Sequence, residues 1–481
     1  MPDYDLILRG GTVVTSTGLK EADVAVAEGR IVALAPQLSG TAREEITATG
    51  LHIFPGVIDA HVHFNEPGRT DWEGIETGSR ALAAGGGTVF FDMPLNAHPP
   101  TLDAESFALK CAAAEKNSLT DFALWGGLVP QNVDRLEELA ACGVIGFKAF
   151  MSASGIEDFS RADDATLRKG MKRAAALKLP VAVHAESEAM TSALAQERIA
   201  ANKTSIRDYL DSRPIAAELE AICRAVDLAG ETGCALHVVH VSSSAGIQLI
   251  TEAKARGVNV SAETCPHYLM LTEDDLETLG AVAKCAPPLR SVDEQEKLWA
   301  RVLAGEVDTI GSDHSPSPPD LKTGANFFQV WGGISGVQHT LPLLLSGAAV
   351  PAAASPLAVS AGGSLAGTAK GLGQPGRLPH YDEAALPLIS NLLSRNVATR
   401  FALSPTKGRI EIGCDADFAL VDLAGEFEVK LEDLFYRHRQ TPYVGRKLRG
   451  RIVRTLLRGQ TIFHDGKIVA TPAGRLLKPQ R

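Results

Sequence analysis

The stretch Ile53–Gly68 reads IFPGVIDAHVHFNEPG, and the fold is decided here. It opens with a Pro-Gly turn, continues as a short apolar run and ends with His61 and His63, one residue apart. Because alternate side chains of an extended strand point to the same side, both imidazoles are predicted to face one way, where a divalent metal could bridge them. A lone His-x-His is at least as often two surface histidines on a polar loop. The rest of the chain has to decide between these interpretations.

Strand-like and helix-like segments alternate along the middle of the chain. Short apolar runs are separated mostly by Ala/Leu/Glu/Lys-rich stretches that are typical of amphipathic helices, and this alternation predicts a parallel sheet. The apolar runs are 56–64, 87–94, 120–128, 143–150, 179–186, 234–242, 258–267 and 307–314. Eight such units over roughly 260 residues predict an α/β protein with a (β/α)8 TIM-like barrel.

Both ends of the chain predict a different kind of structure. Closely spaced β-type runs with Gly and Asp-Gly turns fill residues 4–53, 408–423 and 452–469. They predict one small β-sandwich domain built from both termini, with the barrel inserted between its two parts. The expected domains are 1–54 and 405–481 for the two parts of the sandwich and the tail, and 55–404 for the barrel. Residues 349–380 are rich in Gly, Pro, Ala and Ser and are predicted to be partly loop.

Composition excludes several classes of protein. The 481 residues are 45% hydrophobic and carry a net charge of −10 without a basic stripe, so a nucleic-acid partner is not expected. Seven scattered cysteines without CxxC spacing favour reduced thiols over a disulfide framework. The N-terminus has no signal-peptide pattern and no run of 18 apolar residues occurs, so we expect a cytoplasmic protein without a membrane span.

Polar residues interrupt the apolar runs near their carboxyl ends, where the active sites of barrels lie. They are His61, His63, Lys148, His184, His240 and Asp313. Each has an ordinary structural explanation when it is taken alone: a hydrogen-bonded histidine, a snorkelling lysine or a helix-capping aspartate. Because all six are directed to one rim, a shared metal site is the better interpretation.

Lys148 needs a specific chemistry to serve such a site. A protonated ammonium has no lone pair and repels a metal. The apolar neighbours in GFKAF (146–150) should lower the pKa of its amine by desolvation. The neutral amine could then add CO2 to form an anionic carbamate, N6-carboxylysine, which can bridge two metal ions in a hydrolytic site.

Longer motifs resemble those of the cyclic amidohydrolases, the family of allantoinases, dihydroorotases and hydantoinases. The motifs are HVH at 61–63, GFKAF at 146–150, His184, HVVHVSS at 237–243, ETCPHYL at 263–269, PPLR at 287–290, SDHSP at 312–316 and GRIEIGCDADFALVD at 408–422. The resemblance covers essentially the whole chain. It implies two divalent metal ions, with zinc expected and cobalt, manganese or iron as alternatives, because all accept nitrogen and oxygen ligands.

The same resemblance implies a role for each of the six residues. One metal would be held by His61, His63, carboxylated Lys148 and Asp313, and the other by Lys148, His184 and His240. A hydroxide that bridges the metals would attack a ring carbonyl, and Asp313 would carry the proton to the leaving nitrogen. His237, Cys265 and His267 are expected to have structural roles.

Departures from the other branches point to the allantoinase branch. Dihydroorotases have an arginine for the substrate carboxylate where this chain has Asn65, and hydantoinases have tyrosine, serine and asparagine at the positions of Ala153, Ala286 and Gly332. NEPGRTDWEG and GFKAFMSASGIEDF instead are similar to allantoinases. The expected reaction is therefore hydrolysis of a C–N bond in uncharged allantoin to give allantoate, a step of purine degradation.

Substrate contacts are implied by the resemblance as well. They are Asn96, Cys285, Ala286, Ser315 and Gly332. Asn96 could instead complete a turn, Cys285 could fill the core and Ser315 could cap a helix. A small-molecule substrate and a homotetramer are the expected partners.

Two alternatives to this function stay open. One is another activity of the same family, that of a hydantoinase (dihydropyrimidinase) or a dihydroorotase. The other is a non-catalytic, amidohydrolase-like scaffold oligomer. Such scaffolds lose metal ligands, whereas all six candidate ligands are present in this sequence.

Overall fold

The apolar run before His63 forms β6 (Val57–Val62), the first strand of a ring of parallel strands. The computed structural model of the protein describes residues 2–348 and 385–480. Each of the predicted runs contains a strand. The others are β7 (Gly87–Asp92), β8 (Asp121–Leu124) with β9 (Gly126–Gly127), β10 (Phe147–Phe150), β11 (Val181–His184), β12 (Leu236–Val238), β13 (Val260–Thr264) and β14 (Thr309–Ile310). The predicted barrel is confirmed, whereas the loop predicted at 349–380 lies outside the described residues.

Hydrogen bonds hold the ring together in two arcs. One arc pairs β6 to β8 and the other pairs β9 to β14, and only Trp125 separates β8 from β9. The ends of the ring meet where Val62 and His314 form a parallel bridge and the His63 N–H donates to the His314 carbonyl at 2.7 Å. Because the paired barrel strands are all parallel, their carboxyl ends open on one face.

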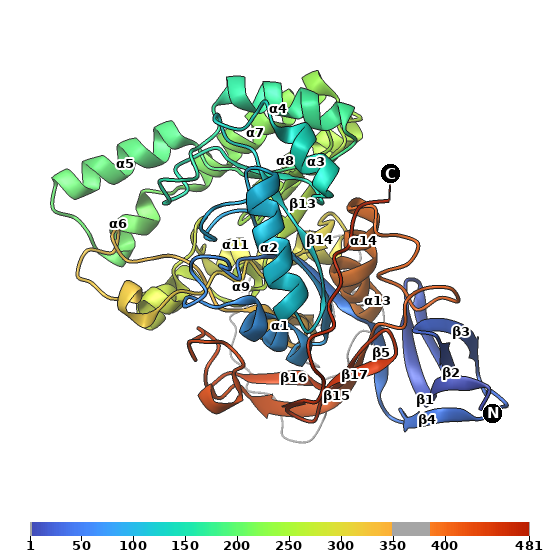
Figure 1. Cartoon of the computed structure of the whole chain (residues 1–481). Helices are drawn as coiled ribbons and strands as arrows, with labels where there is room; N and C mark the ends of the chain where they lie inside the picture. Colours follow the sequence, from blue (N-terminus) through green and yellow to red (C-terminus); the bar gives the residue numbers. More distant parts are fainter. Residues whose placement is uncertain (1, 349–384, 481) are drawn as a thin grey trace, which may run out of the picture.

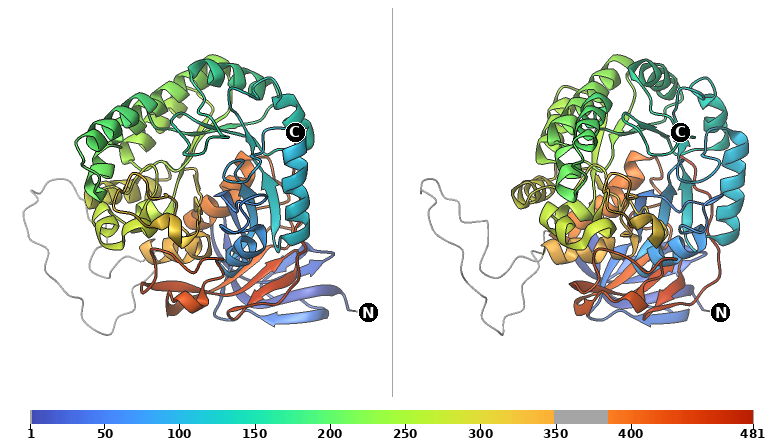
Figure 2. Two further views of the ribbon diagram at one scale, coloured as in Figure 1. Left: turned by 60° about the vertical axis from the view of Figure 1, so that its left-hand side comes forward. Right: turned by 90° about the vertical axis from the view of Figure 1, so that its left-hand side faces the viewer.

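Helices surround the strands on the outside, as both views of Figure 2 show. Several begin at side-chain caps that satisfy free backbone N–H groups: Asp103 accepts from the Ser106 N–H, and Asp163 from the Thr166 N–H. The first eight helices are α1 (Ile75–Ala84), α2 (Ala104–Asn117), α3 (Leu136–Cys142), α4 (Asp164–Ala176), α5 (Glu188–Ala200), α6 (Ile206–Asp211), α7 (Ile215–Thr232) and α8 (Ser244–Ala255).

Further helices follow after α8. They are α9 (Pro266–Met270), α10 (Glu273–Leu279), α11 (Val292–Leu303), α12 (Thr340–Ala348), α13 (Ala385–Ser390) and α14 (Asn396–Arg400). The helical turns are η1 (Gly280–Ala283), η2 (Pro319–Lys322), η3 (Val337–His339), η4 (Asn391–Arg395) and η5 (Leu431–Asp433). Among the described residues, no helix combines the length and the apolar character needed to cross a bilayer.

Both ends of the chain join in one mixed sheet, as predicted. Its strands are β1 (Tyr4–Thr15), β2 (Gly18–Ala27), β3 (Arg30–Ala35), β4 (Ala42–Thr47), β5 (His52–Pro55), β15 (Phe418–Glu428), β16 (Lys447–Leu457), β17 (Gln460–His464) and β18 (Lys467–Ile468). Strand β5 is the junction, because it pairs with β1 in parallel and with β15 in antiparallel orientation. The exact domain limits at 54 and 404 stay predictions.

The sheet is fastened to the base of the barrel by charge and by the C-terminal tail. The Lys407 Nζ lies 2.7 Å from an Asp121 carboxylate oxygen of β8 and 2.7 Å from one of Asp417, which precedes β15. After β18 the chain leaves the sheet and runs back along the barrel (Figure 1), where Leu476 forms a parallel bridge with Phe122. The tail therefore packs on the barrel, a contact that the pattern of β-type runs in the sequence does not indicate.

Candidate metal centre and active site

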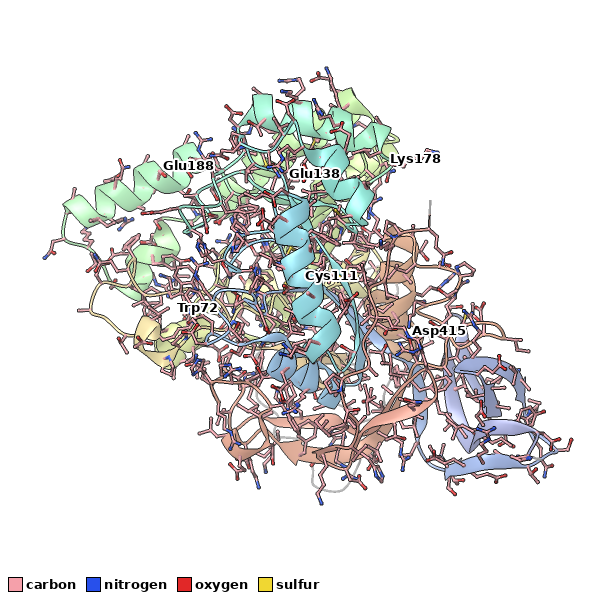
Figure 3. The ribbon with its side chains drawn as sticks, in the orientation of Figure 1. Trp72, Cys111, Glu138, Lys178, Glu188 and Asp415 are labelled. Atoms are coloured by element: carbon pink, nitrogen blue, oxygen red, sulfur yellow. The ribbon has the colours of Figure 1, made fainter. Side chains whose placement is uncertain are left out.

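A cavity of about 400 Å³ opens at the carboxyl ends of the barrel strands. Trp72 and Glu188 lie on this side of the molecule, whereas Asp415 lies on the opposite side near the sheet (Figure 3). The five residues predicted to contact a substrate all line the cavity: Asn96, Cys285, Ala286, Ser315 and Gly332. The four candidate histidines and Asp313 line it as well. Residues from separate strands and loops are therefore brought to one opening.

The first group of candidate ligands comes from β6 and from the end of the last barrel run. His61 Nε2 lies 3.2 Å and His63 Nε2 3.5 Å from the same oxygen of Asp313, Oδ1. All three residues are within reach of one ion, because their ligand atoms lie within 4.8 Å of one another. Burial alone would raise the pKa of the Asp313 carboxyl, but the imidazoles of His61 and His63 outweigh it and hold that pKa well below its usual range.

The second group comes from β11 and from the residues that follow β12. His184 Nδ1 and His240 Nε2 are 3.0 Å apart, and the His240 Nδ1 has no hydrogen-bond partner among the described residues. The His240 ring centroid lies 5.4 Å from that of His61, so the two groups are adjacent. On its other side the His184 ring stacks on Phe150, with the centroids 4.7 Å apart.

Lys148 lies behind these groups on β10 and is fully buried. Its Nζ has no hydrogen-bond partner in the described part of the chain and lies 5.2 Å from the centroid of the Phe150 ring. Burial lowers the pKa of this amine to about 7, although the carboxylates of Asp313 and Glu263 act in the opposite direction. An unpartnered amine in this dry position is costly, and a bound or added group would relieve that cost.

Two glutamates that sequence reasoning missed orient the histidines. Glu263 of β13 lies 2.8 Å from His61 Nδ1, and Glu186, just after β11, lies 2.8 Å from His184 Nε2. Each contact directs the other ring nitrogen toward the neighbouring candidate ligands, His61 Nε2 toward Asp313 and His184 Nδ1 toward His240. Burial opposes ionisation of both glutamates, but hydrogen bonds from His61 and His237 to Glu263, and the charge of Arg213 beside Glu186, lower each pKa to about 2.

Both glutamates stand in or near quoted motifs, but the sequence does not indicate which histidine each one contacts. Glu263 stands in the quoted motif ETCPHYL, and Glu186 follows His184 by two residues. Which imidazole each one meets depends on the pairing of strands that are far apart in the sequence. His237 takes a structural place, since its Nδ1 lies 2.8 Å from the Ser261 hydroxyl oxygen and it does not line the cavity.

Replacing Glu263 by glutamine is expected to weaken metal binding by about 10- to 100-fold, because an amide holds the His61 ring less firmly than a carboxylate does. Isothermal titration calorimetry of the metal-free protein with Zn²⁺ measures the metal affinity. The control is Glu218→Gln, which changes another fully buried glutamate that bonds Ser242 and Ser243 instead of a candidate ligand. Equal metal affinity in Glu263→Gln and the wild type would exclude the orienting role.

Comparison with known proteins places the chain in a class. The model of the amidohydrolase family matches residues 52–462, so the chain belongs to the amidohydrolase family. This family implies a metal centre, and the group of His61, His63 and Asp313 could hold a metal ion. The chain is an enzyme of this hydrolase class.

Relatives of known name are similar over their whole length. The chain is 55% identical to an allantoinase of Rubrobacter xylanophilus, over 100% of this chain and 99% of that protein. It is 43% identical to an allantoinase of Bacillus velezensis, over 99% and 98%. Among solved structures, the L-hydantoinase (dihydropyrimidinase) from Arthrobacter aurescens is similar with a TM-score of 0.90 and 30% identity, over 99% of this chain and 100% of that one.

Proposed function

We propose that the protein hydrolyses allantoin to allantoate by opening its hydantoin ring. One observation carries the proposal: the candidate ligands of several barrel strands converge on a single cavity, with a buried, unpartnered lysine behind them. The choice of substrate is supported by the full-length similarity to proteins named allantoinase.

The donor set fits two cations that share Lys148. We assign His61, His63 and Asp313 to one ion and His184 and His240 to the other. Carboxylated Lys148 would be the shared ligand: its neutral amine attacks the carbon of CO2, an N–C bond forms while one C=O π bond opens to an oxyanion, and the nitrogen releases a proton. Zinc is the proposed metal, since it accepts nitrogen and oxygen ligands of these kinds. Ions bound here would lower the pKa of water and polarise a carbonyl group of the substrate.

Asp313 is the proposed proton carrier. Its carboxylate lines the cavity beside His61 and His63, so it is placed to accept a proton from the attacking water. The same carboxyl then delivers the proton to the ring nitrogen while the C–N bond breaks. Asp313 has a backbone φ of 46°, which is uncommon for a residue other than glycine and indicates that the surrounding structure holds it in place.

The walls of the cavity suit an uncharged ring. Asn65, where a dihydroorotase has arginine, does not line the cavity; its side-chain amide donates to the Pro316 carbonyl at 3.2 Å. The guanidinium of Arg213 does line it, but that charge is paired with Glu186. No free guanidinium in the described chain therefore stands ready to clamp a substrate carboxylate at this site. The Asn96 amide donates to the Ser315 hydroxyl at 3.4 Å, so two of the proposed substrate contacts adjoin.

A substrate panel tests the proposal. The protein is loaded with zinc or cobalt in the presence of bicarbonate, its metal content is measured, and turnover of allantoin, 5-substituted hydantoins, dihydrouracil and dihydroorotate is compared on one preparation. We expect the highest kcat/KM with allantoin. Rapid turnover of dihydroorotate or hydantoins without turnover of allantoin would assign another activity of the family. Absence of bound metal and of all turnover would favour the non-catalytic scaffold.

The proposal also includes a homotetramer, which the sequence resemblance implied, and a cytoplasmic location. Sedimentation velocity of the metal-loaded protein tests the oligomeric state. A monomer at micromolar concentration would contradict it.

A further inference from the structure

Residues 327–333 form one wall of the cavity. This segment contains turns and a bend but no helix or strand. Phe328 to Gly333 all line the cavity. A segment of this kind has no backbone ladder to fix it, so its position depends on other contacts. Two lysines that the sequence does not single out supply several of those contacts, beside backbone hydrogen bonds from the Phe327 N–H to the Thr204 carbonyl and from the Trp331 N–H to the Leu321 carbonyl, each at 2.9 Å.

Lys284 contacts this wall at three points. Its Nζ donates to the carbonyls of Phe327 and Val330, each at 2.5 Å. Its own carbonyl accepts from the Gly333 N–H at 2.7 Å. The ammonium also lies over two aromatic rings, 4.5 Å from the centroid of Tyr209 and 4.9 Å from that of Phe327. Charge-assisted bonds of this type are among the stronger hydrogen bonds in proteins.

The far end of the wall is fixed by Lys322 and by a close approach. The Lys322 Nζ donates to the Gly333 carbonyl at 2.6 Å. Gly333 has a φ of 114°, and a Cβ there would lie 2.1 Å from the Ser315 carbonyl oxygen, so only glycine fits. The wall is thereby pressed against the residues that follow the last barrel strand.

Gly332 lies between these fixed points and is left free. Its N–H and carbonyl have no hydrogen bond with any described residue, and it lines the cavity. A Cβ at Gly332 would meet nothing closer than the Lys284 carbonyl at 3.8 Å, so the space on the Cβ side of this residue is open. An unpaired donor and acceptor in this position can pair with the N–H and C=O groups of a ring amide.

We propose that Lys284 is a positioning residue that clamps the wall at 327–333 and thereby holds Gly332, a substrate contact that the family resemblance already implied, in its place at the cavity. The inference rests on the proposed function, since the clamp would act on the binding of that substrate. Lys284 also lines the cavity, but its ammonium is engaged by the Phe327 and Val330 carbonyls, so its role is assigned to the wall rather than to the reacting atoms. Its loss should therefore weaken substrate binding and leave the chemical step largely intact.

The test replaces Lys284 by methionine, an unbranched side chain that is one atom shorter and lacks the ammonium. We expect KM for allantoin to rise by about 10-fold or more while kcat changes by less than about threefold, as loss of a charge-assisted hydrogen bond used in binding predicts. Amide hydrogen exchange of peptides that cover 327–333 should become faster, and the metal content should not change. Lys322→Met removes the second contact and should show the same pattern with a smaller rise in KM.

The matched control is Lys169→Met, which removes an exposed lysine that pairs with Asp134 on the outside of the barrel. It should keep the wild-type KM and the wild-type exchange. Unchanged KM and exchange in Lys284→Met would overturn the proposal, and so would a loss of metal together with kcat. If Lys284→Met does not fold, Lys322→Met decides by the same criteria. If the wild type does not hydrolyse allantoin, the proposed function fails, whereas hydrogen exchange still decides whether the clamp exists.

Discussion

Replacing Asp313 by asparagine should lower kcat for allantoin by about 10²- to 10⁴-fold, the usual contribution of general acid–base catalysis. The amide has the size of the carboxyl group, so His61 and His63 can stay in place at 3.2 and 3.5 Å. It cannot accept the proton of the attacking water, because its nitrogen carries no available lone pair. The measurement is steady-state turnover of allantoin at saturating substrate.

Metal content is the internal control for this variant. The substitution Asp313→Asn removes a charged candidate ligand, yet four histidines and Lys148 remain, so we expect considerable metal to be retained. Turnover is therefore expressed per bound ion. Normal hydrolysis by Asp313→Asn would mean that another group carries the proton. Loss of all metal from Asp313→Asn would show that the main role of Asp313 is that of a metal ligand.

Replacing Lys148 by alanine is expected to remove most bound metal and nearly all activity. The reason is that the shared ligand of both ions is lost, while the histidines alone leave neighbouring cations without an anion between them. The buried position on β10 leaves space where the side chain was. A short carboxylic acid such as acetate or propionate, added at millimolar concentration with zinc, should enter this space and restore part of the activity.

Lys148→Met is the matched variant. Methionine suits the apolar surroundings of Phe147 and Phe150 and fills the space, so this variant should fold well, lack metal and resist rescue by the acid. If the acid rescues Lys148→Ala but not Lys148→Met, the defect is the loss of a bridging group and not a general structural defect. Full metal content and full activity in Lys148→Ala without added acid would refute the bridging role.

Much of the architecture could be predicted because it depends on local patterns. Each barrel strand was visible as a short apolar run, since strands that are buried on both faces need continuous apolar residues. The candidate ligands could be placed at one rim from the same pattern, because parallel strands in a barrel present their carboxyl ends together. His61 and His63 faced one way for the simpler reason that side chains alternate along a strand.

Individual side-chain and backbone contacts between distant segments could not be predicted. Glu263 and His61 meet at 2.8 Å although 202 residues separate them, and nothing near either residue specifies the other. The clamp by Lys284 depends on carbonyl groups more than 40 residues away, and a backbone carbonyl has no signature in the sequence. The return of the tail to Phe122 likewise followed from tertiary packing.

The sequence by itself determined the barrel, the joining of both ends in one sheet and the kinds of side chain offered to the site. These follow from hydrophobic periodicity and from the chemistry of each residue type, which are properties of neighbours along the chain. Only the tertiary structure decided which ring nitrogen of each histidine faces the cavity, which carboxylates hold the rings and which loop forms the wall. Those outcomes depend on distances of a few ångströms between segments far apart in sequence, and folding alone sets such distances.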